Sequence, residues 1–122
     1  MQGRPRVLDG ATYELKLDHL EDSIFMTVNH QLVDNVPRIH ELFINSFDGE
    51  QLAWTPLASR LVSAVLRQGG DTEFLFTELK DMFSVTSFFY KGQKYPSIMS
   101  LIGEILDNHQ QQLIKNYEKD NS

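Results

Sequence analysis

Residues 58–71 read ASRLVSAVLRQGGD, and this pattern predicts a helix that ends in a sharp corner. Apolar residues recur along the helix at helical spacing: Leu57, Leu61, Val62, Ala64, Val65 and Leu66. Leu57, Leu61, Ala64 and Val65 form the stripe, and Val62 and Leu66 widen it, so we expect this apolar helix to lie against a sheet or between helices. Arg60 and Arg67 share one side of the helix, which we expect to face solvent.

The two ends of this helix carry capping and turn residues. Thr55 is a candidate N-cap, Pro56 suits the first helical position, and Trp54 is expected to anchor the helix entry in the core. After the helix, Gly69 offers the left-handed backbone that ends helices, and Asp71 offers a carboxylate to cap the next one. The sequence therefore predicts two helices joined by a tight corner.

Three strands are predicted ahead of this helix. Residues 12–17 alternate strictly between polar and apolar side chains, and residues 23–32 and 39–47 form two further runs. The connections are short and rich in turn residues, as at residues 34–37. Successive strands joined by short turns form an antiparallel meander.

The two faces of this predicted sheet differ. One face is apolar, and we expect the central helix to cover it: Ile24, Met26, Val28, Leu42 and Ile44. Phe25 and Phe43 point to the opposite face. Either a later segment of the chain covers these two rings, which we favour, or they form an exposed patch that docks a partner.

Helices dominate the second half of the chain. A second helix is predicted over residues 72–83, with an apolar side formed by Phe74, Leu75, Leu79 and Met82. A short hairpin follows within residues 87–95. The last helix is expected to start at Pro96, with an apolar stripe formed by Ile98, Leu101, Ile102, Ile105, Leu106, His109 and Leu113.

The order of strands and then helices indicates a single α+β domain over residues 1–122. Its core is predicted to be a small antiparallel sheet, a three-stranded meander with a short hairpin, packed with about three helices on one face. Residues 1–9 are expected to form an extended arm, and residues 116–122 a frayed polar tail.

Composition excludes several classes of function. The net charge of −6 argues against nucleic acid as a partner, because an acidic chain is not steered toward phosphate backbones. No apolar run approaches membrane-spanning length, and residues 1–9 lack the apolar core of a signal peptide, so we expect no membrane partner and a cytoplasmic location. The chain contains no cysteine, which excludes disulfides, thiolate metal sites and thiol nucleophiles.

The residue types that act in the functional sites of other proteins form no catalytic pattern in this sequence. The histidines lack the spacing of metal ligands: His19, His30, His40 and His109. Gly69 and Gly70 lack the flanking residues of a phosphate-binding loop. Ser59, Ser63 and Ser100 lie on predicted helices and lack a nucleophile elbow. We therefore predict no catalytic residue, no metal and no cofactor.

A set of short motifs nevertheless runs through the chain in a recognisable order. They are Arg4-Pro5, Leu8-x-Gly10-x-Thr12-Tyr13, Phe43-Ile44-Asn45-Ser46, Trp54, the Arg60–Asp71 stretch, Glu78-Leu79-Lys80 with Phe83, and Pro96-Ser97 with Ile102-Gly103. The Arg-x-Gly-Gly-Asp corner and Phe-Ile-Asn-Ser are the most specific. Together they resemble the TSCPD domain, found at the C-terminal end of adenosylcobalamin-dependent (class II) ribonucleotide reductases, in split reductase subunits and as separate small proteins.

The resemblance implies a domain related to a reductase rather than a reductase. Enzymes of this class use a cysteine thiyl radical and a cysteine pair that supplies electrons, and this chain has no cysteine. The cysteine-bearing motif that names the domain is absent, as is the cysteine-rich tail of many relatives. No catalytic residue carries over, and we do not expect the chain to reduce ribonucleotides on its own.

Two functions from different classes follow. The first is a stand-alone, non-catalytic accessory or binding module in deoxyribonucleotide synthesis, whose partner is a ribonucleotide reductase catalytic chain or a second copy of itself. The alternative is a small regulatory protein that binds a nucleotide or another metabolite. Its site would lie where a strand end, two basic side chains and a helix N-terminus converge: Asn45, Arg60, Arg67 and Asp71.

Overall fold

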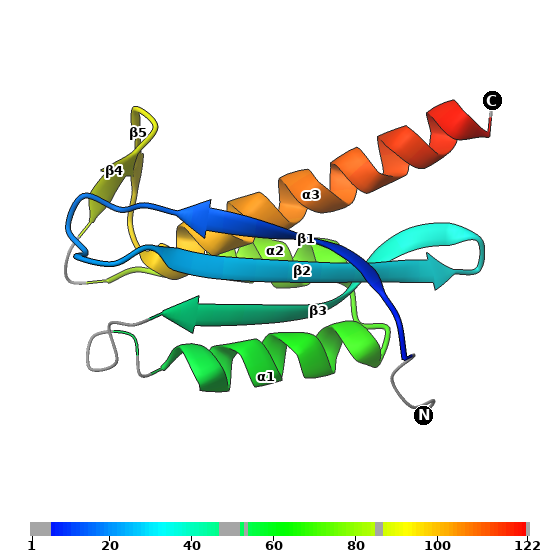
Figure 1. Cartoon of the computed structure of the whole chain (residues 1–122), viewed down its shortest axis with the longest axis horizontal. Coiled ribbons are helices and arrows are strands. Elements are labelled where there is room, and N and C mark those ends of the chain that lie inside the picture. Colours follow the sequence, from blue (N-terminus) through cyan, green and yellow to red (C-terminus); the bar gives the residue numbers. More distant parts are fainter. Residues whose placement is uncertain (1–5, 47–51, 53, 85–86, 122) are drawn as a thin grey trace.

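The chain folds into a three-stranded antiparallel sheet, a separate two-stranded hairpin and three helices, which confirms the α+β prediction. This computed structural model describes residues 6–46, 52, 54–84 and 87–121. The elements in chain order are β1 (Asp9–Leu15), β2 (Ile24–Val33), β3 (Val36–Ser46), α1 (Thr55–Arg67), α2 (Thr72–Lys80), β4 (Phe88–Tyr90), β5 (Gln93–Tyr95) and α3 (Ile98–Asp120) (Figure 1).

The meander has the predicted antiparallel topology, in the order β1-β2-β3. Asp34 and Asn35 form the β2–β3 turn with φ of 52° and 66°, the left-handed backbone that matches strand twist in a two-residue hairpin. Strand β3 therefore starts at Val36, before the predicted residue 39. Pro37 fits within it because β3 is an edge strand, where a missing N–H is tolerated.

The boundaries of β1 also differ from the prediction of residues 12–17. The strand spans Asp9–Leu15, so part of the predicted extended arm is strand. Its first residues pair with β2 at Asp9–His30 and Gly10–Asn29. Backbone pairing with β2 sets the start of β1, whereas the polar/apolar alternation only begins at Thr12.

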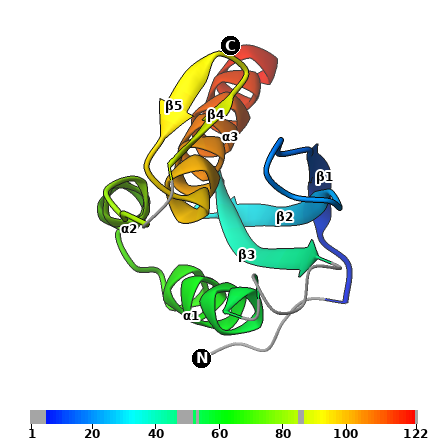
Figure 2. The same cartoon turned by 90° about the vertical axis from the view of Figure 1, so that its left-hand side faces the viewer.

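The apolar face of the sheet is buried as predicted, but a different helix covers it. Ile24, Met26, Val28, Leu42 and Ile44 are all buried. Helix α3 crosses this side of the sheet, α2 packs against α3, and α1 lies along the free edge of β3 (Figure 2). The expectation that the central helix lies over the apolar face is therefore wrong.

The inward side of α1 also differs from the prediction. Leu57, Leu61 and Val65 are exposed, and the buried residues of the helix are Thr55, Ser59, Val62, Ser63 and Leu66. The physical reason lies in β3, whose edge presents backbone groups that need hydrogen-bond partners. Serine side chains meet that need, and leucine side chains cannot.

The start of α1 differs in detail from the prediction. Thr55 does not cap the helix, because its hydroxyl donates a 2.7 Å hydrogen bond to the Leu52 carbonyl. Trp54 occupies the N-cap position without a side-chain hydrogen bond, and it is partly exposed rather than anchored in the core.

The corner after α1 has the predicted geometry. Gly69 has a φ of +78°, and the Asp71 carboxylate accepts a 3.1 Å hydrogen bond from the Phe74 amide. Helix α2 ends at Lys80, before the predicted residue 83. It buries Phe76 and Leu79 against α3 and leaves Phe74 exposed, and Met82, beyond the end of the helix, is also exposed.

Helix α3 is longer than predicted. Ser97 caps it by accepting a 3.0 Å hydrogen bond from the Ser100 amide, so Pro96 lies outside. The helix continues to Asp120, so the predicted frayed tail is helical over most of its length. Side-chain pairs such as Gln112–Asn116, joined at 2.9 Å, stabilise these exposed turns.

The ring of Phe43 is 43% exposed, so our favoured expectation that a later segment of the chain covers it is wrong.

Within the described ranges, no helix is both long enough and apolar enough to cross a membrane.

Candidate functional site

The outer edge of β3 determines how α1 is placed. The Ser63 hydroxyl accepts a 2.9 Å hydrogen bond from the Leu42 amide and donates a 3.0 Å bond to the Leu42 carbonyl. One turn earlier in α1, the Ser59 hydroxyl accepts a 3.2 Å bond from the Ile44 amide. The two serines therefore replace a neighbouring strand and fix the rotation of α1 about its axis.

Two more side chains complete this edge. The Gln110 amide of α3 accepts a 2.8 Å bond from the Ile39 amide and donates a 2.9 Å bond to the Pro37 carbonyl. Arg38 donates to the carbonyls of Leu66 and Gly70 at the C-terminal end of α1. A cation at this end is favourable, because the last carbonyls of a helix carry partial negative charge.

Burial of the serine side turns an apolar side of α1 outward. Leu57 is 62% exposed, Leu61 60% and Val65 41%, and the three residues are spaced four apart, so they line one face of the helix. We call these three residues the outer stripe. A monomeric protein gains nothing from exposing three large aliphatic side chains in a row, and such a row is typical of a contact surface.

Charge on α1 differs from charge on the whole chain. Arg60 and Arg67 are exposed, and α1 contains no Asp or Glu. The whole chain has a net charge of −6. The outer stripe is therefore part of a basic helix on an acidic protein.

The four predicted ligand-binding residues lie in two groups along α1. Asn45 follows Ile44, which is bonded to Ser59 in the first half of the helix, so Asn45 and Arg60 lie in that region. Arg67 and Asp71 lie at and beyond the other end, and Asp71 uses its carboxylate to cap α2. Ligand binding by these residues stays a prediction. Stabilisation against heat by millimolar nucleotide is the test.

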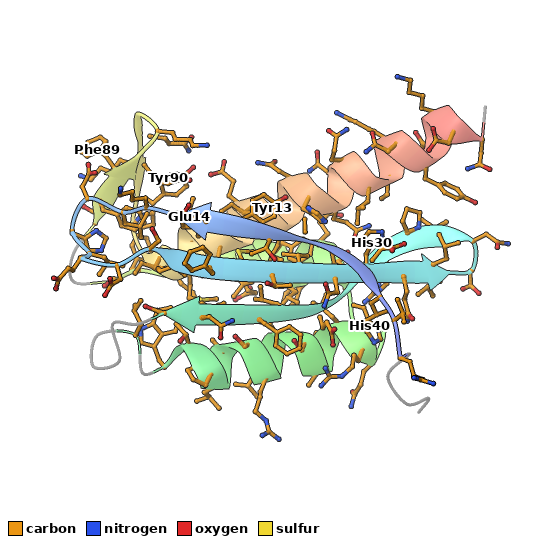
Figure 3. The ribbon with its side chains drawn as sticks, in the orientation of Figure 1. Tyr13, Glu14, His30, His40, Phe89 and Tyr90 are labelled. Carbon is orange, nitrogen blue, oxygen red and sulfur yellow. The ribbon has the colours of Figure 1, made fainter. Side chains whose placement is uncertain are left out.

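Two histidines far apart in the sequence meet between the sheet and α3. The Tyr13 hydroxyl and Nδ1 of His109 share a 2.6 Å hydrogen bond, and the rings of His30 and His109 are 6.4 Å apart. Figure 3 labels Tyr13 on β1 and His30 on β2. Burial, and secondarily the neighbouring His30, lowers the pKa of His109. The cluster therefore favours a neutral His109 in the folded protein.

This cluster does not resemble a metal centre. Across the described ranges, no group of three or more His, Asp or Glu side chains is placed to hold a metal ion. Nδ1 of His30 and Nε2 of His109 are buried and have no hydrogen-bond partner there. A buried ring nitrogen without a partner loses the hydrogen bond that water would supply, which carries a free-energy cost.

Sequence reasoning missed the serines and Gln110. The signal was present, since two serine hydroxyls four residues apart on one side of a helix are suited to pairing with backbone groups on that side. Gln110, in the polar part of α3, carried no comparable local signal.

Comparison with known proteins identifies a family. The family model described as TSCPD domain matches residues 2–110, most of the chain. No curated protein and no solved structure matches the chain. The match confirms the resemblance carried by the ordered motifs, including Phe43–Ser46 and Arg67–Asp71.

Proposed function

The chain belongs to the TSCPD domain family, and from this membership we propose that it is a non-catalytic accessory module that binds a ribonucleotide reductase catalytic chain. In this proposal the outer stripe of α1 is the contact surface, and the module serves deoxyribonucleotide synthesis.

The observation that carries the proposal is the exposure of the outer stripe. Leu57, Leu61 and Val65 repeat every four residues, the spacing with which an amphipathic helix enters an apolar groove. Fully burying one such side chain contributes at most about 1.5–3 kcal/mol, so the three supply the apolar centre of an interface to which surrounding contacts must add.

Charge favours a different protein over a second copy of this chain. Symmetric pairing through α1 would bring Arg60 and Arg67 of both copies into one interface, with no carboxylate from either α1. Like charges at an interface are unfavourable. The partner surface that fits is apolar at its centre and acidic at its rim.

The chemistry of reduction belongs to the partner in this proposal. The chain has no cysteine and so cannot supply a thiyl radical or an electron-donating pair. Its contribution is binding, which holds the catalytic chain in a particular assembly or conformation.

Binding to the purified reductase catalytic chain from the same organism tests the proposal. Leu61→Glu should weaken binding by at least about tenfold, because a carboxylate would be desolvated at the centre of the interface. Leu32→Glu is the matched control, since Leu32 is also 60% exposed but lies on β2.

Both variants should unfold at the wild-type urea midpoint, because neither side chain is part of the core. Equal affinity for Leu61→Glu and Leu32→Glu would remove α1 from the interface. Failure of the wild-type chain to bind the reductase would overturn the proposed function itself.

A further inference from the structure

A cavity of about 570 Å³ opens where four separate stretches of chain meet. They are the β1–β2 connection, the residues just before α1, the segment after α2, and the start of α3. Pockets for small ligands commonly have volumes of about 300–1,000 Å³. The described residues that line it are His19, Leu52, Trp54, Met82, Phe83, Ser84, Ser97, Ile98 and Met99.

The wall of this cavity is mainly apolar and aromatic. Leu52 and Met99 are buried, whereas Trp54, Met82 and Phe83 are exposed, with Phe83 84% exposed. Large side chains that would normally bury one another in a core instead surround an open space. Filling that space with an apolar ring would remove their surfaces from water, which is favourable.

The polar groups on the wall are few. The Ser97 hydroxyl donates a 2.6 Å bond to the Met82 carbonyl and accepts a bond from Ser100, so its proton is already used. The ring of His19 packs at 5.0 Å from the ring of Phe88. Within the described chain, the side chains of His19 and Ser84 form no hydrogen bond and are available to a ligand.

Charge limits the class of ligand. The described wall contains no Lys, Arg, Asp or Glu. An ionised ligand would lose its hydration without gaining a compensating charge, which is costly. The described lining residues therefore favour a molecule without net charge.

From these features we infer that the cavity binds an uncharged small molecule with an aromatic ring. The ring lies against Trp54 and Phe83, and a polar substituent bonds to the hydroxyl of Ser84 or to His19. The cavity contains none of the outer-stripe residues, so this inference does not rest on the proposed function.

Fluorescence gives a direct readout, because Trp54 is the only tryptophan in the chain. The protein is titrated with benzamide, benzoate and cyclohexanecarboxamide, which separate the contributions of charge and aromaticity. Benzamide should give a saturable change with a dissociation constant of about 1–10 mM, as expected for so small a ligand. Benzoate and cyclohexanecarboxamide should bind at least about tenfold more weakly.

Three variants locate the binding site. Phe83→Ala should weaken benzamide binding by about tenfold, and Phe89→Ala should leave it unchanged. The two rings are both exposed, at 84% and 63%, but only Phe83 lines the cavity. Ser84→Ala should weaken binding by about threefold to tenfold through the lost hydrogen bond.

Amide chemical shifts from the same titration supply a second readout. Shifts should concentrate at residues 82–84 and 97–99 and saturate with the fluorescence change. A linear response to all three probes, or equal effects of Phe83→Ala and Phe89→Ala, would overturn the inference. So would a Trp54 response to a protein partner with none to benzamide, because the cavity would then receive a side chain of that partner.

Discussion

Replacing Ser63 by alanine tests how α1 is held, and two effects predict opposite signs. Alanine is the better helix former, so intrinsic propensity alone predicts a gain of up to about 0.7 kcal/mol. The Ser63 hydroxyl, however, is bonded to both the amide and the carbonyl of Leu42, and both residues are buried. Each orphaned buried group costs about 1–3 kcal/mol. We therefore expect Ser63→Ala to lower the free energy of unfolding by about 2–4 kcal/mol.

Urea denaturation followed by circular dichroism measures this loss, and Leu61→Ala is the matched control on the same helix. Leu61 points to solvent, so its truncation should change the free energy of unfolding by less than about 0.5 kcal/mol. If Ser63→Ala proves neutral or stabilising, or Leu61→Ala proves the more damaging change, the serine side of α1 does not hold the helix on β3.

The remaining predictions concern the corner and two titrating groups. Gly69→Val should cost about 1–3 kcal/mol in urea denaturation, because a β-branched residue is strained at a φ of +78°, and Asp71→Ala about 1 kcal/mol through the lost cap. The lowered pKa of His109 means that the unfolded chain takes up a proton first, so unfolding free energy should fall as pH drops below about 6.5; a pH series in which His109→Gln keeps the full slope would contradict this. Burial and the hydrogen bond to Glu104 raise the pKa of Tyr95 to about 12. The protonated Tyr95 therefore adds to the free energy of unfolding below pH 10, and this contribution is lost between about pH 10 and 12. Tyrosinate absorbance should show that late ionisation in the wild type and not in Tyr95→Phe.

Local signals in the sequence predict the antiparallel meander and the corner correctly, although β1 and β3 start earlier than predicted. The alternation of Ile24, Met26 and Val28 identifies the buried face of β2 without any knowledge of its neighbours. Gly69 and Asp71 likewise specify a helix end and a helix start by their own backbone and side-chain chemistry. Features of this kind depend on interactions within a few residues.

The rotation of α1 could not be predicted in the same way. Hydrophobicity favours burying Leu57 and Leu61, but the edge of β3, some twenty residues earlier in the chain, requires hydroxyls. The contact between His30 and His109 and the cavity beside Trp54 also join segments remote in sequence. These features depend on tertiary packing, which periodicity within one segment does not encode.

The most direct test of the central claim is hydrogen exchange of the chain with and without the reductase catalytic chain. If the outer stripe is the contact surface, exchange should slow in peptides that cover α1, Thr55–Arg67, and stay unchanged in the β2–β3 hairpin around Leu32. Slower exchange elsewhere, with α1 unaffected in a complex that does form, would contradict the claim.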